Sequence, residues 1–238
     1  MTSLANQTIG IEKLQLIFVD DASDDGGETW NCLLEFESHY PEQVTVVHLD
    51  ENIRQGGARN VGLEYAQADY IGYVDGDDWL ESAMYKRLYQ CMKEYNCDIV
   101  DCRMMRDYPN GRTYIYHKMP NRLDAEEKSI MEGGTHWIDR FGEEGYGGGV
   151  VTGLYKKELL LKSGVKFPEK ILYEDNYWVA ILMLYVKRYF HLAEDLYHYR
   201  QREDSTVHKK NAMHHVDRLA IEEMKLKTYH DLHIYERY

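Results

Sequence analysis

Three clusters of acidic residues each stand at one end of an apolar segment, and this arrangement most constrains the fold. The apolar run at 70–74 leads into Asp-Gly-Asp-Asp at 75–78, and the run at 14–19 leads into Asp20-Asp21. The third cluster, Glu174-Asp175, precedes an apolar helical segment. Carboxylates crowded at the end of a buried strand repel one another, and a divalent cation that prefers oxygen ligands removes that repulsion. The pattern predicts a Mg²⁺ or Mn²⁺ site at the ends of strands.

Apolar runs alternate with helical patterns along the chain. Strands are predicted at 14–19, 44–49, 70–74, 97–104 and 113–117, and helices at 30–40, 57–68, 80–95, 156–163, 174–188 and from 213 to the C-terminus. Strands that alternate with helices predict an α/β fold with a mostly parallel sheet flanked by helices. We interpret 109–149 as a hairpin and loops, in which the glycine-rich stretch 145–149 is either a mobile lid or a plain connector.

Composition excludes several classes of protein. The 238 residues are 44% hydrophobic, which suffices for one α/β core. The net charge of −13 argues against binding to nucleic acid. The four cysteines lack Cys-x-x-Cys spacing, so we expect free thiols in a reducing compartment rather than a zinc site. The N-terminus does not have the pattern of a signal peptide, and the longest apolar stretch is too short to span a membrane.

Two enzyme classes with related motifs fit poorly. A phosphatase of the haloacid dehalogenase type also places Asp-x-Asp after a strand, but here Asp-Trp follows at 78–79, and that reading leaves Asp20-Asp21 unexplained. A dinucleotide oxidoreductase needs Gly-x-Gly-x-x-Gly after its first strand, and the residues after Val19 do not contain it.

Five motifs occur in an order that matches a known family. They are Phe-Val-Asp-Asp-Ala-Ser-Asp-Asp at 18–25, Asn-Ile-Arg-Gln-Gly-Gly-Ala-Arg-Asn-Val-Gly at 52–62, Asp-Gly-Asp-Asp-Trp at 75–79, Tyr-Glu-Asp at 173–175 and Tyr-Arg-Gln-Arg at 199–202. From residue 3 to about 210 the chain resembles a family 2 glycosyltransferase, of the type that builds bacterial capsule, exopolysaccharide and lipopolysaccharide. The resemblance implies the Rossmann-like GT-A fold over 1–210, with a nucleotide-binding half at about 1–105, an acceptor half at about 106–210, and a helical extension at 211–238.

The same resemblance implies a donor site. Asp21 would contact the uracil or ribose of a nucleotide-sugar, Asp75 the ribose or a metal-bound water, and Asp77 a Mn²⁺ or Mg²⁺ ion that bridges the diphosphate. The cation would stabilise the charge that develops on the departing nucleoside diphosphate. The residues implied are Asp20, Asp21, Arg59, Asp75 and Arg200 for the donor, and Asp77, Asp75 and His208 for the metal.

The residues alone leave other interpretations of these positions. Asp is a good N-cap, so 75–78 also suits a solvated turn before a helix at Leu80, and we expect Asp78 to act only as a cap. Arg59 would then lie on the exposed face of its helix, and Arg200 in a solvated basic loop. The donor assignments therefore depend on the resemblance.

Catalysis is assigned in the same way. Transfer with inversion is a single displacement at the anomeric carbon, and it needs a general base for the acceptor hydroxyl. By resemblance Asp175 is that base and Glu174 supports it. The residues alone favour a different interpretation, in which both acids lie in the first turn of a helix and complement the helix dipole.

The chain departs from the family at its start. Members usually begin with an apolar strand that ends in Pro-x-Tyr-Asn, and we expect roughly 25–30 corresponding residues to be missing here. Either the start codon is misassigned, the chain is a fragment, or another segment fills the gap. We therefore expect the strand at 14–19 to lack a neighbour in the sheet. This leaves two functional hypotheses: an active transferase, or a non-catalytic or fragmentary GT-A domain that binds a partner.

The implied reaction moves a sugar to a saccharide or lipid-linked acceptor in surface polysaccharide synthesis, and we expect a UDP-sugar as the donor. We expect the protein in the cytoplasm, with no nucleic-acid partner. The resemblance leaves open peripheral association with the inner face of the cell membrane, and self-association as a homodimer.

Overall fold

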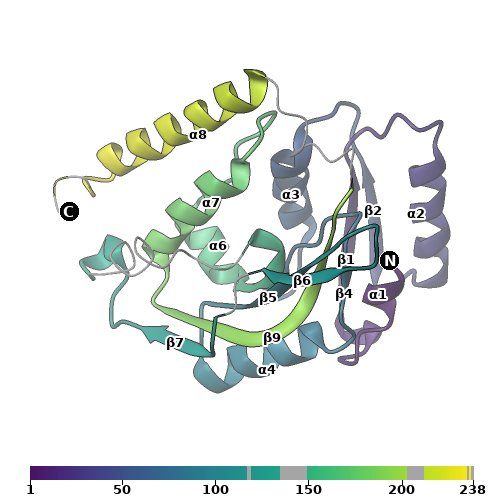
Figure 1. Cartoon of the computed structure of the whole chain (residues 1–238), viewed down its shortest axis with the longest axis horizontal. Coiled ribbons are helices and arrows are strands. Elements are labelled where there is room, and N and C mark those ends of the chain that lie inside the picture. The colour runs from purple at the N-terminus through teal and green to yellow at the C-terminus, as the bar shows by residue number, and fades with distance from the viewer. Residues whose placement is uncertain (117–118, 135–148, 203–211, 235, 237–238) are drawn as a thin grey trace.

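The computed structural model describes residues 1–116, 119–134, 149–202, 212–234 and 236 (Figure 1). The strands are β1 (Leu16–Asp20), β2 (Val44–His48), β3 (Tyr70–Gly72), β4 (Trp79–Leu80), β5 (Ile99–Asp107), β6 (Thr113–Tyr116), β7 (Arg122–Ala125), β8 (Gly153–Lys156) and β9 (Arg188–Arg200). The helices are α1 (Thr2–Ala5), α2 (Glu28–His39), α3 (Arg54–Tyr65), α4 (Met84–Tyr95), α6 (Lys157–Ser163), α7 (Glu174–Leu182) and α8 (Ala212–Asp231). Short 3₁₀ turns cover Ile11–Lys13, Ile130–Glu132, Val150–Thr152 and Met183–Tyr185.

The strands form two sheets. β1 and β2 pair in parallel, and a seven-stranded sheet has the order β3-β8-β5-β9-β4, with β6 added to β5 and β7 to β9. The predicted α/β class with flanking helices is confirmed (Figure 1). The sheet is less parallel than we expected, because among the described strand pairs only β1–β2 and β5–β9 are parallel. The short connection from β5 to β6 is a hairpin, which requires antiparallel pairing.

A cavity of about 320 Å³ separates β1 from β3. In the described structure β1 pairs only with β2, and β3 only with β8. The cavity, which we call the β1–β3 cavity, is bounded by Ile17 and Val19 of β1, by residues 70–76, and by one face of α3. Ile17, Phe18 and Val19 are only half-buried. An apolar run of this kind is typical of a strand that is covered on both faces, whereas β1 is only partly covered. Because β1 pairs with β2 alone among the described strands, its other edge lacks a partner, as we expected.

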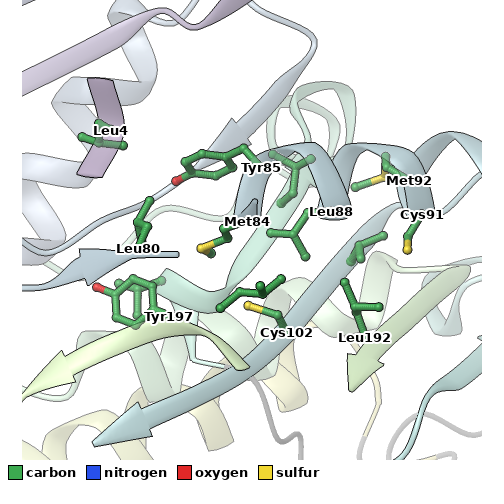
Figure 2. Packing of buried hydrophobic residues seen from close by; sticks show 14 of the residues in the cluster. Leu4, Leu80, Met84, Tyr85, Leu88, Cys91, Met92, Cys102, Leu192 and Tyr197 are labelled. Carbon is green, nitrogen blue, oxygen red and sulfur yellow. The ribbon is translucent and has the colours of Figure 1, made fainter. Parts of the chain in front are cut away.

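Two hydrophobic clusters hold the sheets and helices together. In the first, Met84, Leu88 and Met92 follow helical spacing on α4 and pack on β5 and β9, where Figure 2 shows them beside Leu192 and Tyr197. In the second, Trp178 of α7 stacks on Phe167 at 4.4 Å between ring centroids. This second cluster fixes the start of α7 and the loop that precedes it.

Several boundaries differ from those expected. The helix predicted at 57–68 runs from Arg54 to Tyr65, and the one predicted at 80–95 begins at Met84, because Trp79 and Leu80 pair with β9 as β4. The helix predicted at 174–188 ends at Leu182, and β9 begins at Arg188. Of the glycine-rich stretch 145–149, only Gly149 lies in the described residues.

The C-terminal helix is present as α8 and packs alongside α7 (Figure 1). Whether 1–210 and 211–238 are separate units stays a prediction. In the described part of the chain, the helices do not include one with the length and hydropathy needed to cross a membrane.

Candidate active site

The loop after β3 is fixed by contacts with β9. Asp78 accepts a hydrogen bond from the Tyr197 hydroxyl at 2.7 Å and another from the Arg200 amide at 2.9 Å. Burial raises the pKa of the Asp78 carboxyl to about 6. The expectation that Asp78 only caps a helix is therefore wrong, because α4 begins at Met84 with Ala83 at its N-cap. Asp78 instead connects the Asp-rich loop to the C-terminal end of β9 through these two hydrogen bonds.

Arg59 joins two acidic clusters that are distant in sequence. Its guanidinium donates to Asp75 Oδ1 and to Glu174 Oε1, both at 2.8 Å, and lies 5.4 Å from the centre of the Phe167 ring. The Arg59 side chain is only 12% exposed, so it does not lie on an open helix face. Burial lowers the pKa of Arg59, but the two carboxylates outweigh that effect and raise it. Removing one member of such a buried set leaves an uncompensated charge.

Glu174 is buried, and its electrostatic environment differs from that of Asp175. Burial raises the pKa of the Glu174 carboxyl, and the Arg59 guanidinium opposes that rise. Asp175 is half-buried and accepts a hydrogen bond from the Asn176 amide at 2.9 Å. Among the described residues, no side chain donates a hydrogen bond to Asp175. Of the two acids, Asp175 thus has the more accessible carboxylate.

Close approach of α3 to the loop before α7 depends on Gly56. A Cβ atom at this position would lie 2.3 Å from the Pro168 carbonyl oxygen and 2.9 Å from Glu174 Cγ. Asn60 then fixes the same loop, because its side chain donates to the Phe167 carbonyl at 2.9 Å and accepts from the Phe167 amide at 3.0 Å. Glycine at 56 therefore allows Arg59 to reach Glu174.

The end of β1 carries Asp20 and Asp21 in different roles. Asp20 is buried and accepts hydrogen bonds from the Ser23 amide at 3.1 Å and from His48 Nδ1 at 2.9 Å. Burial would raise the pKa of Asp20, but these hydrogen bonds outweigh it and lower the pKa. Asp21 is half-buried, accepts from the Ile53 amide at 2.7 Å, and lines the β1–β3 cavity. Asp20 thus shapes the loop, whereas Asp21 borders the cavity.

The end of β9 and the residues directly after it supply two arginines. Arg202 pairs with Asp77 at 2.5 Å, and the Arg200 guanidinium lies 5.6 Å from the centre of the Trp79 ring. Both arginines thus stand beside the 75–79 motif, with their charges toward a half-exposed carboxylate and an aromatic ring. His208 lies outside the described residues, so its predicted approach to a metal stays a prediction.

Two carboxylates suit a divalent cation that is bound together with a ligand. Asp75 and Asp77 each give one oxygen to an arginine, which leaves their other oxygens for a hard cation. Within the described residues, no group of three or more acidic, histidine or cysteine side chains could hold a metal by itself. Mg²⁺ commonly binds one or two carboxylates and completes its shell with phosphate and water oxygens. The residues therefore fit a metal that arrives with a diphosphate.

Comparisons with known proteins show which family has similar sequences. Residues 1–153 match the family model described as Glycosyl transferase family 2. "Uncharacterized glycosyltransferase EpsJ" of Bacillus subtilis strain 168 is 30% identical over 205 residues, which cover 85% of this chain and 56% of that protein. "Minor teichoic acid biosynthesis protein GgaB" of the same strain is 29% identical over 86% of this chain and 21% of its own length. The chain thus spans about half the length of EpsJ and about a fifth of the length of GgaB.

A solved structure shares the fold. The crystal structure of S. aureus TarS 1–349 in complex with UDP-GlcNAc superposes with a TM-score of 0.67 at 22% identity, over 89% of this chain and 56% of that one.

Proposed function

The chain belongs to glycosyl transferase family 2, and on that premise we propose that it transfers a sugar from a UDP-sugar to a saccharide or lipid-linked acceptor with inversion. The observation that carries the proposal is the Arg59 bridge between Asp75 and Glu174. Through this bridge Asp75, proposed for the donor, and Glu174, the neighbour of the proposed base, share one cation, although Glu174 comes 115 positions after Arg59 in the sequence.

In the proposed reaction each residue has one task. Asp21 and Asp75 hold the nucleoside, and Arg200 and Arg202 stand where they would meet the diphosphate. When bound at Asp77, a Mg²⁺ or Mn²⁺ ion would neutralise charge on the leaving group. Asp175 removes the proton from the acceptor hydroxyl as that oxygen attacks the anomeric carbon.

Glu174 supports Asp175 from its buried position. Because Arg59 neutralises Glu174, the pair carries less negative charge toward the incoming hydroxyl. Glu174 is thus held beside Asp175 by its ion pair with Arg59, which leaves Asp175 as the proposed base.

The biological setting is also a proposal. The curated relatives include a protein named for minor teichoic acid biosynthesis, and a solved relative is a complex with UDP-GlcNAc. We therefore place this protein in surface polysaccharide synthesis, in the cytoplasm at the inner face of the membrane, where a lipid-linked acceptor would be met. A homodimer is compatible with this setting.

Calorimetry with UDP tests the donor site. We expect binding with Mn²⁺ and much weaker binding with a chelator, and we expect Asp77→Ala to remove the difference. Asp69→Ala is the matched control, because Asp69 is an exposed acid directly before the first residue of β3, at the opposite end of that strand from Asp77. Equal binding with and without metal would contradict the metal assignment. Mn²⁺-dependent transfer or hydrolysis of UDP-sugars then tests the reaction itself.

The second candidate is a non-catalytic domain of the same family. The β1–β3 cavity favours it, because this cavity borders Asp21, Arg59 and Asp75, so the donor site is open on that side. UDP binding without any transfer or hydrolysis, across UDP-sugars and acceptors, would support this candidate.

A further inference from the structure

Helix α8 holds the two residues that come directly before Glu174. Asp217 Oδ2 accepts a hydrogen bond from the Leu172 amide at 3.2 Å. The Tyr173 hydroxyl and His214 Nδ1 share a hydrogen bond of 3.0 Å, and the Arg218 guanidinium lies 4.6 Å from the centre of the Tyr173 ring. One turn of α8 thus contacts both residues.

The face of α8 toward this loop is polar where an ordinary packing face would be apolar. His214 and Asp217 are each only 8% exposed, while Ile221 on the same face is 1% exposed. A carboxylate that is removed from water is costly unless it is hydrogen-bonded. Asp217 satisfies this need with a backbone amide of the loop rather than with a neighbour on its own helix. The hydrogen bond from Asp217 therefore fixes the position of the loop relative to α8.

Tyr173 has a conformation that its surroundings must maintain. It is the N-cap of α7 with φ 66° and ψ 23°, in the left-handed region that residues with a side chain rarely adopt. Such a residue persists where its neighbours fix it. The direction in which the chain leaves Tyr173 sets where the first turn of α7, and hence its two acids, will point.

The other side of the same loop is held by α3. Asn60 pairs with Phe167, and the Lys170 amide donates to the Ile53 carbonyl at 3.0 Å. These loop contacts end at residue 170, and α3 next contacts the chain at Glu174, where Arg59 donates to Oε1 at 2.8 Å. Between these two points, Leu172 and Tyr173 are held by the contacts from α8.

We propose that α8 positions the Glu174–Asp175 pair, with Tyr173 and Asp217 as positioning residues. This inference rests on the proposed function for the role of the two acids, but the contacts themselves do not. If α8 loosens, Tyr173 is free to leave its left-handed conformation, and Glu174 moves relative to Arg59. Asp175 then meets the acceptor at the wrong angle even though the donor site is intact.

The test compares three variants of Asp217 and its helix in the full chain. Asp217→Ala removes the acceptor for the Leu172 amide, whereas Asp217→Asn keeps an oxygen there and should restore it. Leu219→Ala is the control on the same helix, because Leu219 is 71% exposed. Tyr173→Phe, which keeps the ring under Arg218, serves if Asp217→Ala does not fold.

Two measurements separate the inference from the proposed function. Hydrogen–deuterium exchange of peptides covering 170–178 should become faster in Asp217→Ala and stay unchanged in Leu219→Ala. With UDP-sugar and acceptor, kcat should fall by about 10- to 100-fold, since misplacement of about 1 Å costs turnover of that order, while the donor KM stays within about twofold. Asp217→Asn should recover most of both.

Unchanged exchange in both Asp217→Ala and Tyr173→Phe would overturn the inference, whether or not the wild-type chain transfers sugar. Faster exchange with full kcat would overturn it as well, because the loop would then not control the acids. A wild-type chain without transferase activity refutes the proposed function, and the exchange measurement alone then decides whether α8 holds this segment.

Discussion

Substitution of Gly56 by alanine provides the sharpest test of how the site is assembled. The added Cβ would lie 2.3 Å from the Pro168 carbonyl oxygen, 2.9 Å from Glu174 Cγ and 3.1 Å from Phe167 Cβ. To reach ordinary contact, α3 and the loop before α7 must separate by about 1 Å. Since one of the obstructing atoms belongs to the backbone, a side-chain rotation cannot relieve the clash.

The magnitude follows from two opposing effects. Overpacking costs about 1–3 kcal/mol, and this site belongs at the upper end because a backbone atom obstructs the methyl group. Alanine in place of glycine in a helix returns about 0.5–1 kcal/mol. The net loss of about 2 kcal/mol corresponds to a fall of about 4–8 °C in Tm for a chain of this size. Turnover should fall by about 100-fold, because Glu174 moves with the loop.

Gly62→Ala is the matched control on the same helix. Its Cβ would lie 3.6 Å from Val19 Cγ2, an ordinary contact, so we expect Tm to rise slightly. Thermal melting followed by circular dichroism and a transfer assay measure both effects. A Gly56→Ala variant that melts at or above the wild-type temperature, with full turnover, would refute the packing argument.

Three further outcomes are expected. Asp175→Asn should lower turnover by about 10²–10⁴-fold and keep donor binding, and unchanged turnover would move the base to Glu174 or elsewhere. The lowered pKa of Asp20 stabilises the fold at pH values above its ordinary pKa of 3.8, and this stabilisation is lost as pH falls through the folded pKa. Asp20→Asn should therefore show a shallower fall in Tm between about pH 5 and 3 than the wild type. Parallel melting curves for the two proteins would contradict this. A strand supplied to the open edge of β1 should fill the β1–β3 cavity and raise Tm, because each buried backbone group without a partner costs about 1–3 kcal/mol, and an unchanged Tm would contradict this.

The ends of the strands were predictable because they depend on local pattern. An apolar run followed by acids places those acids at the carboxyl end of a strand, and the structure has β1 ending at Asp20 and β3 ending shortly before Asp75. The contact between Arg59 and Glu174 was not predictable from the residues, because it depends on the close packing at Gly56, which only the folded chain reveals. The family resemblance supplied the candidates but not the bridge.

The long interior strand β9 was missed for physical reasons. Its apolar positions are interrupted by His191, Glu194 and Asp195, so period-two alternation is lost. Two of these polar groups are satisfied through β5, where His191 hydrogen-bonds with Asp101 at 2.9 Å and Asp195 pairs with Arg103 at 2.8 Å, whereas Glu194 pairs with Arg87 of α4 at 2.6 Å. The register between β5 and β9 also shifts near Cys102. A strand that is stabilised by long-range polar pairing in this way has little local signal.

The error at Asp78 has a similar origin. Aspartate before an apolar helical pattern predicts a cap, but the pairing of β4 with β9 draws Trp79 and Leu80 into a strand and gives Asp78 to Tyr197. The Tyr197 hydroxyl could have been suspected only from a tyrosine in a buried strand near the family's Tyr-Arg-Gln-Arg motif.

The position of β9 in the sheet has a consequence for synthesis of the protein. β5, β4 and α4 are translated well before β9, yet all three pack against it. Until about residue 200 has left the ribosome, the apolar face of α4 has no strand from β9 to cover it, and the large sheet cannot be completed. During synthesis the nascent chain therefore exposes apolar surface until β9 is complete. We expect chaperones that bind nascent chains to recognise this surface.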